Sequence, residues 1–181
     1  MMALSTAPLA GQQVAVLPLT LLVPTDSLSD LPPFDDHAHA LLWADSIIGA
    51  TLASRGPEVR WIFPPELRKI AHRSAGMVVD PDHMGQGIMR APNLKIVPDP
   101  FRVSLRGLVA LSGGRYAFIP AAMAYSREAD GTLRAEISLV LADSRSGAVS
   151  WRTLATGFGP TPVRALTSAL DKVFPLSLGF R

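Results

Sequence analysis

The chain contains no cysteine among its 181 residues. Disulfides, thiolate metal sites and cysteine nucleophiles are therefore excluded. Lysine is nearly as scarce, with Lys69, Lys95 and Lys172 alone, and 17 basic against 15 acidic residues leave a net charge of +2. Proteins that bind nucleic acid through its phosphates need clustered basic side chains, whereas the arginines here are scattered. We expect no nucleic acid partner, although the mild basic bias suits an anionic membrane surface.

Long apolar runs are also missing. The best one, residues 14–24, is interrupted by Pro18 and covers about half of the ~20 residues that a spanning helix needs. We therefore expect no transmembrane helix. The start of the chain lacks the charged and long apolar regions of a secretory signal and resembles the end of a cleaved one. We interpret residues 1–12 as a flexible segment, 13–175 as a single α/β domain and 176–181 as a tail.

The hydrophobic content of 48% is ample for a buried core, and its clearest pattern lies near the C-terminus. From residue 133 to residue 152, apolar residues alternate with polar ones, stop at a polar turn and then resume. Such alternation predicts a β-hairpin with one buried face. We interpret Asp143 and Gly147 as turn residues and Trp151 as a packing residue.

The first half of the chain alternates between strand and helix patterns. Residues 14–19 are almost continuously apolar, which predicts a central strand covered on both faces, and residues 24–36 form a loop rich in proline and aspartate. Apolar residues then recur at helical spacing over 40–52. A short strand at 59–63 is followed by a helix that begins at Pro64, because proline is favoured at the first helical position.

The second half begins with a helix at 101–111 that should end at Gly113. Strands at 115–126 and 132–142 lead into the hairpin, and Pro160 and Pro162 open a last helix. The expected fold is therefore a mixed α/β sheet of the α+β kind. A β-α-β-α half is followed by a helix, a three-stranded antiparallel meander and a C-terminal helix.

Four short stretches, taken in order, carry a resemblance: VAVLPL (14–19), VRWIFPPEL (59–67), LSGGRYAFIPA (111–121) and LVLADSRSGAVSWR (139–152). The order resembles the α/β domain shared by curli-secretion-channel lipoproteins, the N-terminal domain of the Tol-system propeller protein and lipoprotein activators of peptidoglycan synthases. The resemblance implies protein binding in a bacterial envelope, without catalytic residues or cofactor. The chain shows no lipoprotein cysteine and no extra amphipathic strands of a pore-forming relative, so we expect no pore.

Two clusters hold the residue types of a metal or catalytic site. Asp35-Asp36-His37-Ala-His39 has zinc-type ligands, but an aspartate there also suits a helix cap. Asp80-Pro-Asp82-His83 offers two carboxylates and an imidazole for acid/base work, but Asp-Pro also opens turns. We expect neither to act as a site, and Gly85-Gln-Gly87 lacks the third glycine of a dinucleotide fingerprint.

A partner surface is the better hypothesis for the irregular loop at 76–99. It carries Met77, Met84, Ile88 and Met89, and methionine side chains adapt well to a partner. The alternative is that these methionines hold the loop on its own core. Arg102 and Arg106, one helical turn apart, are added as candidates for acidic groups or lipid phosphates, against the alternative of a solvated helix face.

The sequence thus favours a non-enzymatic accessory protein that binds other proteins in a bacterial envelope, for example as a peripheral subunit of a membrane complex. The expected location is the periplasm or the membrane surface. The alternative is a metal-binding or hydrolytic domain that uses Asp80, Asp82 and His83, or His37 and His39, in one concave pocket.

Overall fold

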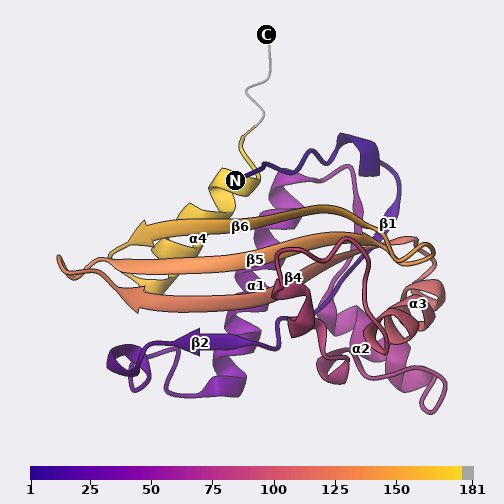
Figure 1. The fold of residues 1–181 in the computed structure, drawn as a ribbon, viewed down its shortest axis with the longest axis horizontal. Coiled ribbons are helices and arrows are strands. Elements are labelled where there is room, and N and C mark those ends of the chain that lie inside the picture. Colours follow the sequence, from indigo (N-terminus) through magenta and orange to yellow (C-terminus); the bar gives the residue numbers. More distant parts are fainter. Residues whose placement is uncertain (177–181) are drawn as a thin grey trace, which may run out of the picture.

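The computed structural model describes residues 1–176 (Figure 1). Its strands are β1 (Gln13–Val16), β2 (Leu22–Pro24), β3 (Arg60–Ile62), β4 (Tyr116–Arg127), β5 (Leu133–Asp143) and β6 (Val149–Gly159). Its α-helices are α1 (His37–Arg55), α2 (Pro64–Arg73), α3 (Phe101–Ser112) and α4 (Pro162–Val173). Short 3-10 helices are η1 (Ala7–Leu9), η2 (Asp26–Leu28), η3 (Pro81–His83) and η4 (Gln86–Arg90).

The strands form one mixed sheet in the order β3-β1-β4-β5-β6, which confirms the predicted fold class. β1 runs parallel to both β3 and β4, and β4, β5 and β6 form the antiparallel meander. The sequence interpretation missed β2, which begins two residues before the predicted loop and pairs with the far half of β4. A strand of three residues that ends in Pro24 has too short an alternation to be recognised locally, and only its pairing with β4 defines it.

Two hydrophobic clusters cover the two faces of the sheet. α1 and α4 pack on one face, and α2, α3 and the loop residues up to Val97 pack on the other. Val14 and Val16 belong to the first cluster while Ala15 and Leu17 belong to the second. β1 is therefore buried on both sides, which confirms the prediction of a central strand.

Helix boundaries follow local chemistry. Asp36 caps α1, because its carboxylate accepts a hydrogen bond of 3.1 Å from the backbone N–H of His39. Pro64 is the first residue of α2, and Gly113 ends α3 with a φ of +84°, a conformation that favours glycine. α4 begins at Pro162 and not at Pro160, since Thr161 caps it by accepting from Arg164 N–H. No helix of the described residues is both long and apolar enough to cross a membrane.

The segments outside the regular elements are packed on the domain. Leu4 and Leu9 of the first 12 residues are buried, and Leu4 N–H donates to the carbonyl of Val173 at 3.0 Å. The loop at 76–99 is anchored by the fully buried Gln86, whose side-chain amide donates to the carbonyls of Pro18 and Pro81. Of the predicted tail at 176–181, all but Leu176 lies outside the described residues.

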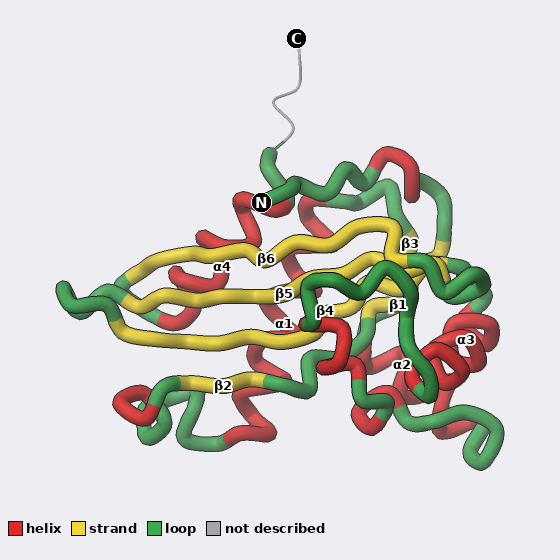
Figure 2. The backbone as a smooth tube through the Cα atoms, viewed as in Figure 1, coloured by secondary structure: helices red, strands yellow, loops and turns green. Residues whose placement is uncertain are grey.

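One half of one sheet face is left uncovered by residues 1–176. α2, α3 and η4 cover the half nearest β1, and Figure 2 shows the far ends of β4, β5 and β6 with no helix in front of them. Ala124, Leu154 and Phe158 are exposed there, although their neighbours along each strand are buried on the opposite face. The packing of the described residues therefore leaves this half of the sheet face open to solvent.

Candidate functional site

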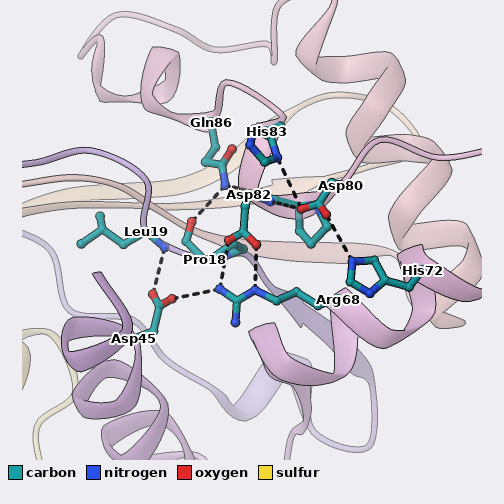
Figure 3. Close-up of polar contacts among 10 residues, drawn as sticks. Pro18, Leu19, Asp45, Arg68, His72, Asp80, Asp82, His83 and Gln86 are labelled. Atoms are coloured by element: carbon teal, nitrogen blue, oxygen red, sulfur yellow. Dashed lines mark hydrogen bonds and ion pairs between the residues drawn. The ribbon is translucent and has the colours of Figure 1, made fainter. Parts of the chain in front are cut away.

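The predicted cluster at 80–83 forms a turn, shown in Figure 3. Asp80 accepts a hydrogen bond of 2.8 Å from the N–H of Asp82, and this bond holds the pKa of the Asp80 carboxyl below its usual range. Its two oxygens also lie 3.4 Å from Nε2 of His72 and 3.7 Å from Nδ1 of His83. Both imidazoles are mostly exposed to solvent, so the group is a surface turn and lies outside any enclosed cavity.

The second carboxylate of this cluster is already occupied. Both oxygens of Asp82 accept hydrogen bonds from Arg68, at 2.8 and 2.9 Å. The geometry is the two-pronged pairing that guanidinium and carboxylate groups favour. Arg68 belongs to α2, so the ion pair ties that helix to the loop at 76–99. The structure gives Asp82 the role of an anchor between two segments.

Sequence reasoning missed Asp45, which lies on α1 beside this network (Figure 3). One of its oxygens accepts a hydrogen bond of 2.9 Å from Leu19 N–H, and the other lies 3.7 Å from Nη2 of Arg68. Burial raises the pKa of the Asp45 carboxyl to about 7. An acidic residue directly after the buried Ala44 was the available signal, but the burial of Asp45 depends on α2 and on the β1–β2 connection.

The histidines at the start of α1 are not brought together with other ligands. Both His37 and His39 are exposed in the first turn, and Asp36 serves as the helix cap. Across residues 1–176, no group of three histidine, aspartate or glutamate side chains has a geometry that could hold a metal ion. The helix-cap interpretation of this cluster is therefore confirmed by the Asp36 hydrogen bond.

The structure divides the predicted partner residues. Met77 and Ile88 are exposed, at 80% and 43%, but Met84 and Met89 are buried in the second hydrophobic cluster. The last two hold the loop on its own core, so a partner surface that includes them is wrong. Arg106 is exposed.

Arg102 is directed at the β5–β6 turn, where its Nη2 donates to the carbonyl of Ser146 at 2.8 Å. It therefore supports the turn in which Asp143 accepts hydrogen bonds from the N–H groups of Arg145 and Ser146. Gly147 there has a φ of +76°, and Trp151 is buried in the core. The interpretation of these residues as turn and packing residues is confirmed.

The open half of the sheet holds a groove of about 500 Å³. Its floor and walls are mainly apolar and come from segments far apart in the sequence, among them Leu21, Val23, Ala122, Ala124, Ser138 and Leu154. Val23 and Leu154 are 54% and 59% exposed. The only sequence signal was Leu154 and Phe158, which are apolar at positions of β6 where the alternation calls for polar residues.

Two arginines border this groove. Arg152 donates to the carbonyls of Ala91 and Leu94, and burial lowers the pKa of its guanidinium. Arg90 donates to the carbonyl of Gly87 at 2.9 Å. Within the described part of the chain, neither has a carboxylate within 4.0 Å.

The carboxylate that lines the same groove belongs to Glu136, which is paired with Arg134. The apolar groove is therefore bordered by two cationic groups without a described anionic partner. Such a surface is complementary to a bound molecule that carries apolar side chains together with a carboxylate.

No family model matches the chain, and no curated protein matches it. Solved structures are similar to it over most of its length. PelC from Paraburkholderia phytofirmans, solved as a dodecamer, has 20% identity and a TM-score of 0.47 over 96% of this chain and 92% of its own. The C-terminal domain of LpoB from Salmonella enterica has 13% identity and a TM-score of 0.47 over 81% and 82%.

The lipoprotein GNA1162 from Neisseria meningitidis has 13% identity and a TM-score of 0.45 over 82% and 83% of the two chains. At such low identity the likeness is one of fold, and no activity or partner is transferred from it.

Proposed function

We propose that this protein is a non-enzymatic accessory protein that binds another protein in a bacterial envelope through the groove on its open sheet face. One observation carries the proposal: an apolar groove of about 500 Å³ on the half of the sheet face that no α-helix of the described residues covers. Exposed apolar side chains such as Val23 and Leu154 cost free energy in water, and contiguous sets of them mark contact surfaces.

The contacts of the rival cluster favour this function over catalysis. Asp82 is held on both oxygens by Arg68, and Asp80 caps the turn at Asp82. A general base needs a free oxygen directed at a substrate in a sheltered pocket. The groove offers the shelter, but it is lined mainly by aliphatic side chains, whose chemistry is that of binding.

The resemblance in the sequence supports an envelope location, in the periplasm or at the membrane surface. The net charge of +2 is compatible with contact to an anionic membrane surface. Membrane association would then be peripheral or through a partner complex.

The proposal is tested by gentle isolation of the protein from the membranes of cells that make it, followed by identification of the proteins that accompany it. Wild type is compared with Leu154→Asp, which places a charge in the groove. Leu111→Asp is the matched control, because Leu111 is also an exposed leucine, at 44%, but lies on α3. We expect a specific companion with wild type and Leu111→Asp and its loss with Leu154→Asp. Wild-type protein that is isolated alone would contradict the proposal.

A further inference from the structure

β6 is an edge strand of the sheet, with β5 as its only strand neighbour in the described part of the chain (Figure 1). Its first residues are partly covered on the outer side. Val149 N–H donates to the carbonyl of Lys95 at 2.9 Å, and Ile96 forms an antiparallel bridge with Ala148. The chain therefore begins to add a strand to this edge and leaves it after a single bridge.

Further along β6, Met2 N–H donates to the hydroxyl of Thr153 at 3.2 Å, and one side chain occupies a backbone carbonyl of the free edge. Lys172 of α4 donates a hydrogen bond of 2.6 Å to the carbonyl of Thr156, and its ammonium lies 5.8 Å from the ring centroid of Phe158. In an antiparallel sheet, alternate residues direct their N–H and C=O groups to the same side. Leu154 and Phe158 therefore also direct peptide groups to the free edge. A lysine over an exposed edge is a common protection against unwanted strand pairing.

Beside this edge lie an arginine without a described carboxylate partner and two exposed apolar side chains. Arg152 lines both the groove on the open face and a second hollow, of about 530 Å³, where the bridge at Ala148 ends. Its guanidinium has backbone carbonyls as partners and no carboxylate of the described residues within 4.0 Å. On the same face, Leu154 and Phe158 are exposed, at 59% and 47%.

We propose that an extended segment of a partner protein adds as a strand to the free edge of β6, from Arg152 to Phe158. Its apolar side chains on the open face contact Leu154 and Phe158, because side chains opposite one another on neighbouring strands are in contact. A carboxylate of the segment pairs with Arg152, and Lys172 leaves Thr156 as the strand enters. The inference rests on the proposed function and names the form and chemistry of the bound segment.

The test uses a phage-displayed library of random eight-residue peptides, selected on immobilised protein. On wild type we expect enrichment of peptides that alternate apolar residues and carry an acidic residue. Lys172→Ala removes the side chain that occupies the edge and should bind the enriched peptides about tenfold more tightly. Arg152→Gln should remove the preference for the acidic residue.

Thr156→Pro is the decisive variant. Proline removes the N–H that faces the edge, and it is tolerated on edge strands where that N–H points away from the neighbouring strand. It should abolish peptide binding while the variant keeps the wild-type far-UV circular dichroism. A second measurement does not depend on this variant: bound peptide should slow the hydrogen exchange of Leu154, Thr156 and Phe158 in wild type.

The inference is overturned if no peptide is enriched, if the enriched peptides bind Thr156→Pro as they bind wild type, or if bound peptide leaves the amides of Leu154, Thr156 and Phe158 unprotected. Self-association of Lys172→Ala in sedimentation that displaces the peptides would assign the edge to a second copy of the chain and overturn it as well. If the native companion is lost with Leu154→Asp but retained with Thr156→Pro, the proposed function stands and strand addition fails. If the companion is retained with Leu154→Asp, the proposed function itself fails.

Discussion

The guanidinium of Arg68 holds both carboxylate oxygens of Asp82, at 2.8 and 2.9 Å, and lies 3.7 Å from Asp45. Three segments therefore meet at one side chain: α2, the loop that contains η3, and α1. Asp82, one of the two carboxylates that the sequence offered for acid/base chemistry, therefore helps to hold these segments together.

Replacement of Asp82 by alanine should destabilise the protein. The variant loses two charge-assisted hydrogen bonds at a partly exposed site, so we expect a decrease of about 1–2 kcal/mol in the free energy of unfolding. Urea denaturation measures this change. Asp30→Ala is the control, because Asp30 is exposed and makes no ion pair within the described residues. Equal stability of the two variants would show that the Arg68–Asp82 pair contributes nothing.

Asp45 should make the stability depend on pH around neutrality. Its pKa is raised from 3.8 to about 7 in the folded state, so between these values the folded state binds more protons than the unfolded state. Stability therefore falls as pH rises through this range, by about 2 kcal/mol from pH 5 to pH 7 for this group. Asp45→Asn should flatten that dependence, as measured by denaturation at several pH values. An unchanged slope in the variant would contradict the assignment.

Asp143 should act in the opposite direction. Pairing with Arg115 lowers the pKa of its carboxyl to about 2. Its stabilisation is therefore complete above the ordinary pKa of 3.8 and is lost as pH falls through 2. We expect Asp143→Asn to be less stable than wild type by about 1–2 kcal/mol at pH 7, with the difference reduced at pH 2.5. A constant difference across this range would exclude the charge as the cause.

Gly157 is a position where a methyl group does not fit. A Cβ there would lie 2.2 Å from the backbone oxygen of Ala165 and 2.2 Å from the backbone nitrogen of Ala169. α4 thus packs directly against the β6 backbone, and Gly157→Ala should cost at least about 3 kcal/mol or prevent folding. Gly49→Ala is the matched control, since its Cβ would meet only the Phe63 ring, at 3.5 Å, and alanine favours a helix. Thermal unfolding compares the two variants, and similar melting temperatures would contradict this close packing.

Met77 and Met89 should behave differently towards oxidation. Met77 is 80% exposed and Met89 is fully buried, so hydrogen peroxide should convert Met77 to the sulfoxide first. Mass spectrometry of peptides at timed intervals measures the order. Met89→Ala should cost about 2–4 kcal/mol, whereas Met77→Ala should leave stability unchanged. Equal oxidation rates would mean that the loop opens in solution.

Several features could be predicted from the sequence because their cause is local. Asp36 as a helix cap and Pro64 as a first helical residue depend on the backbone a few residues away. The same holds for the turn at Asp143 and Gly147, where the side chain and the positive φ serve the turn itself. The alternation of apolar and polar residues predicted β4, β5 and β6 because every second side chain of a strand packs against the same core.

The candidate site was less predictable because it depends on contacts between distant residues. Met84 and Met89 share a loop and a residue type with Met77, yet only the packing of that loop on α2 and α3 decides which of them are exposed. Asp45 has no unusual neighbours in the sequence, and its burial comes from Leu19 and Arg68, 26 and 23 positions away.

The sequence by itself determined the kinds and order of the four α-helices and of the strands other than β2, the central position of β1 and the mixed α/β class. These follow from periodicity and from chain-local chemistry, which each segment carries without its neighbours in space. Tertiary structure alone decided the pairing of β2 with β4, the raised pKa of Asp45, and the groove beside the free edge of β6. The physical reason is that contacts with distant segments decide whether a residue is buried and whether a strand edge is paired. The residues adjacent in the sequence do not specify those contacts.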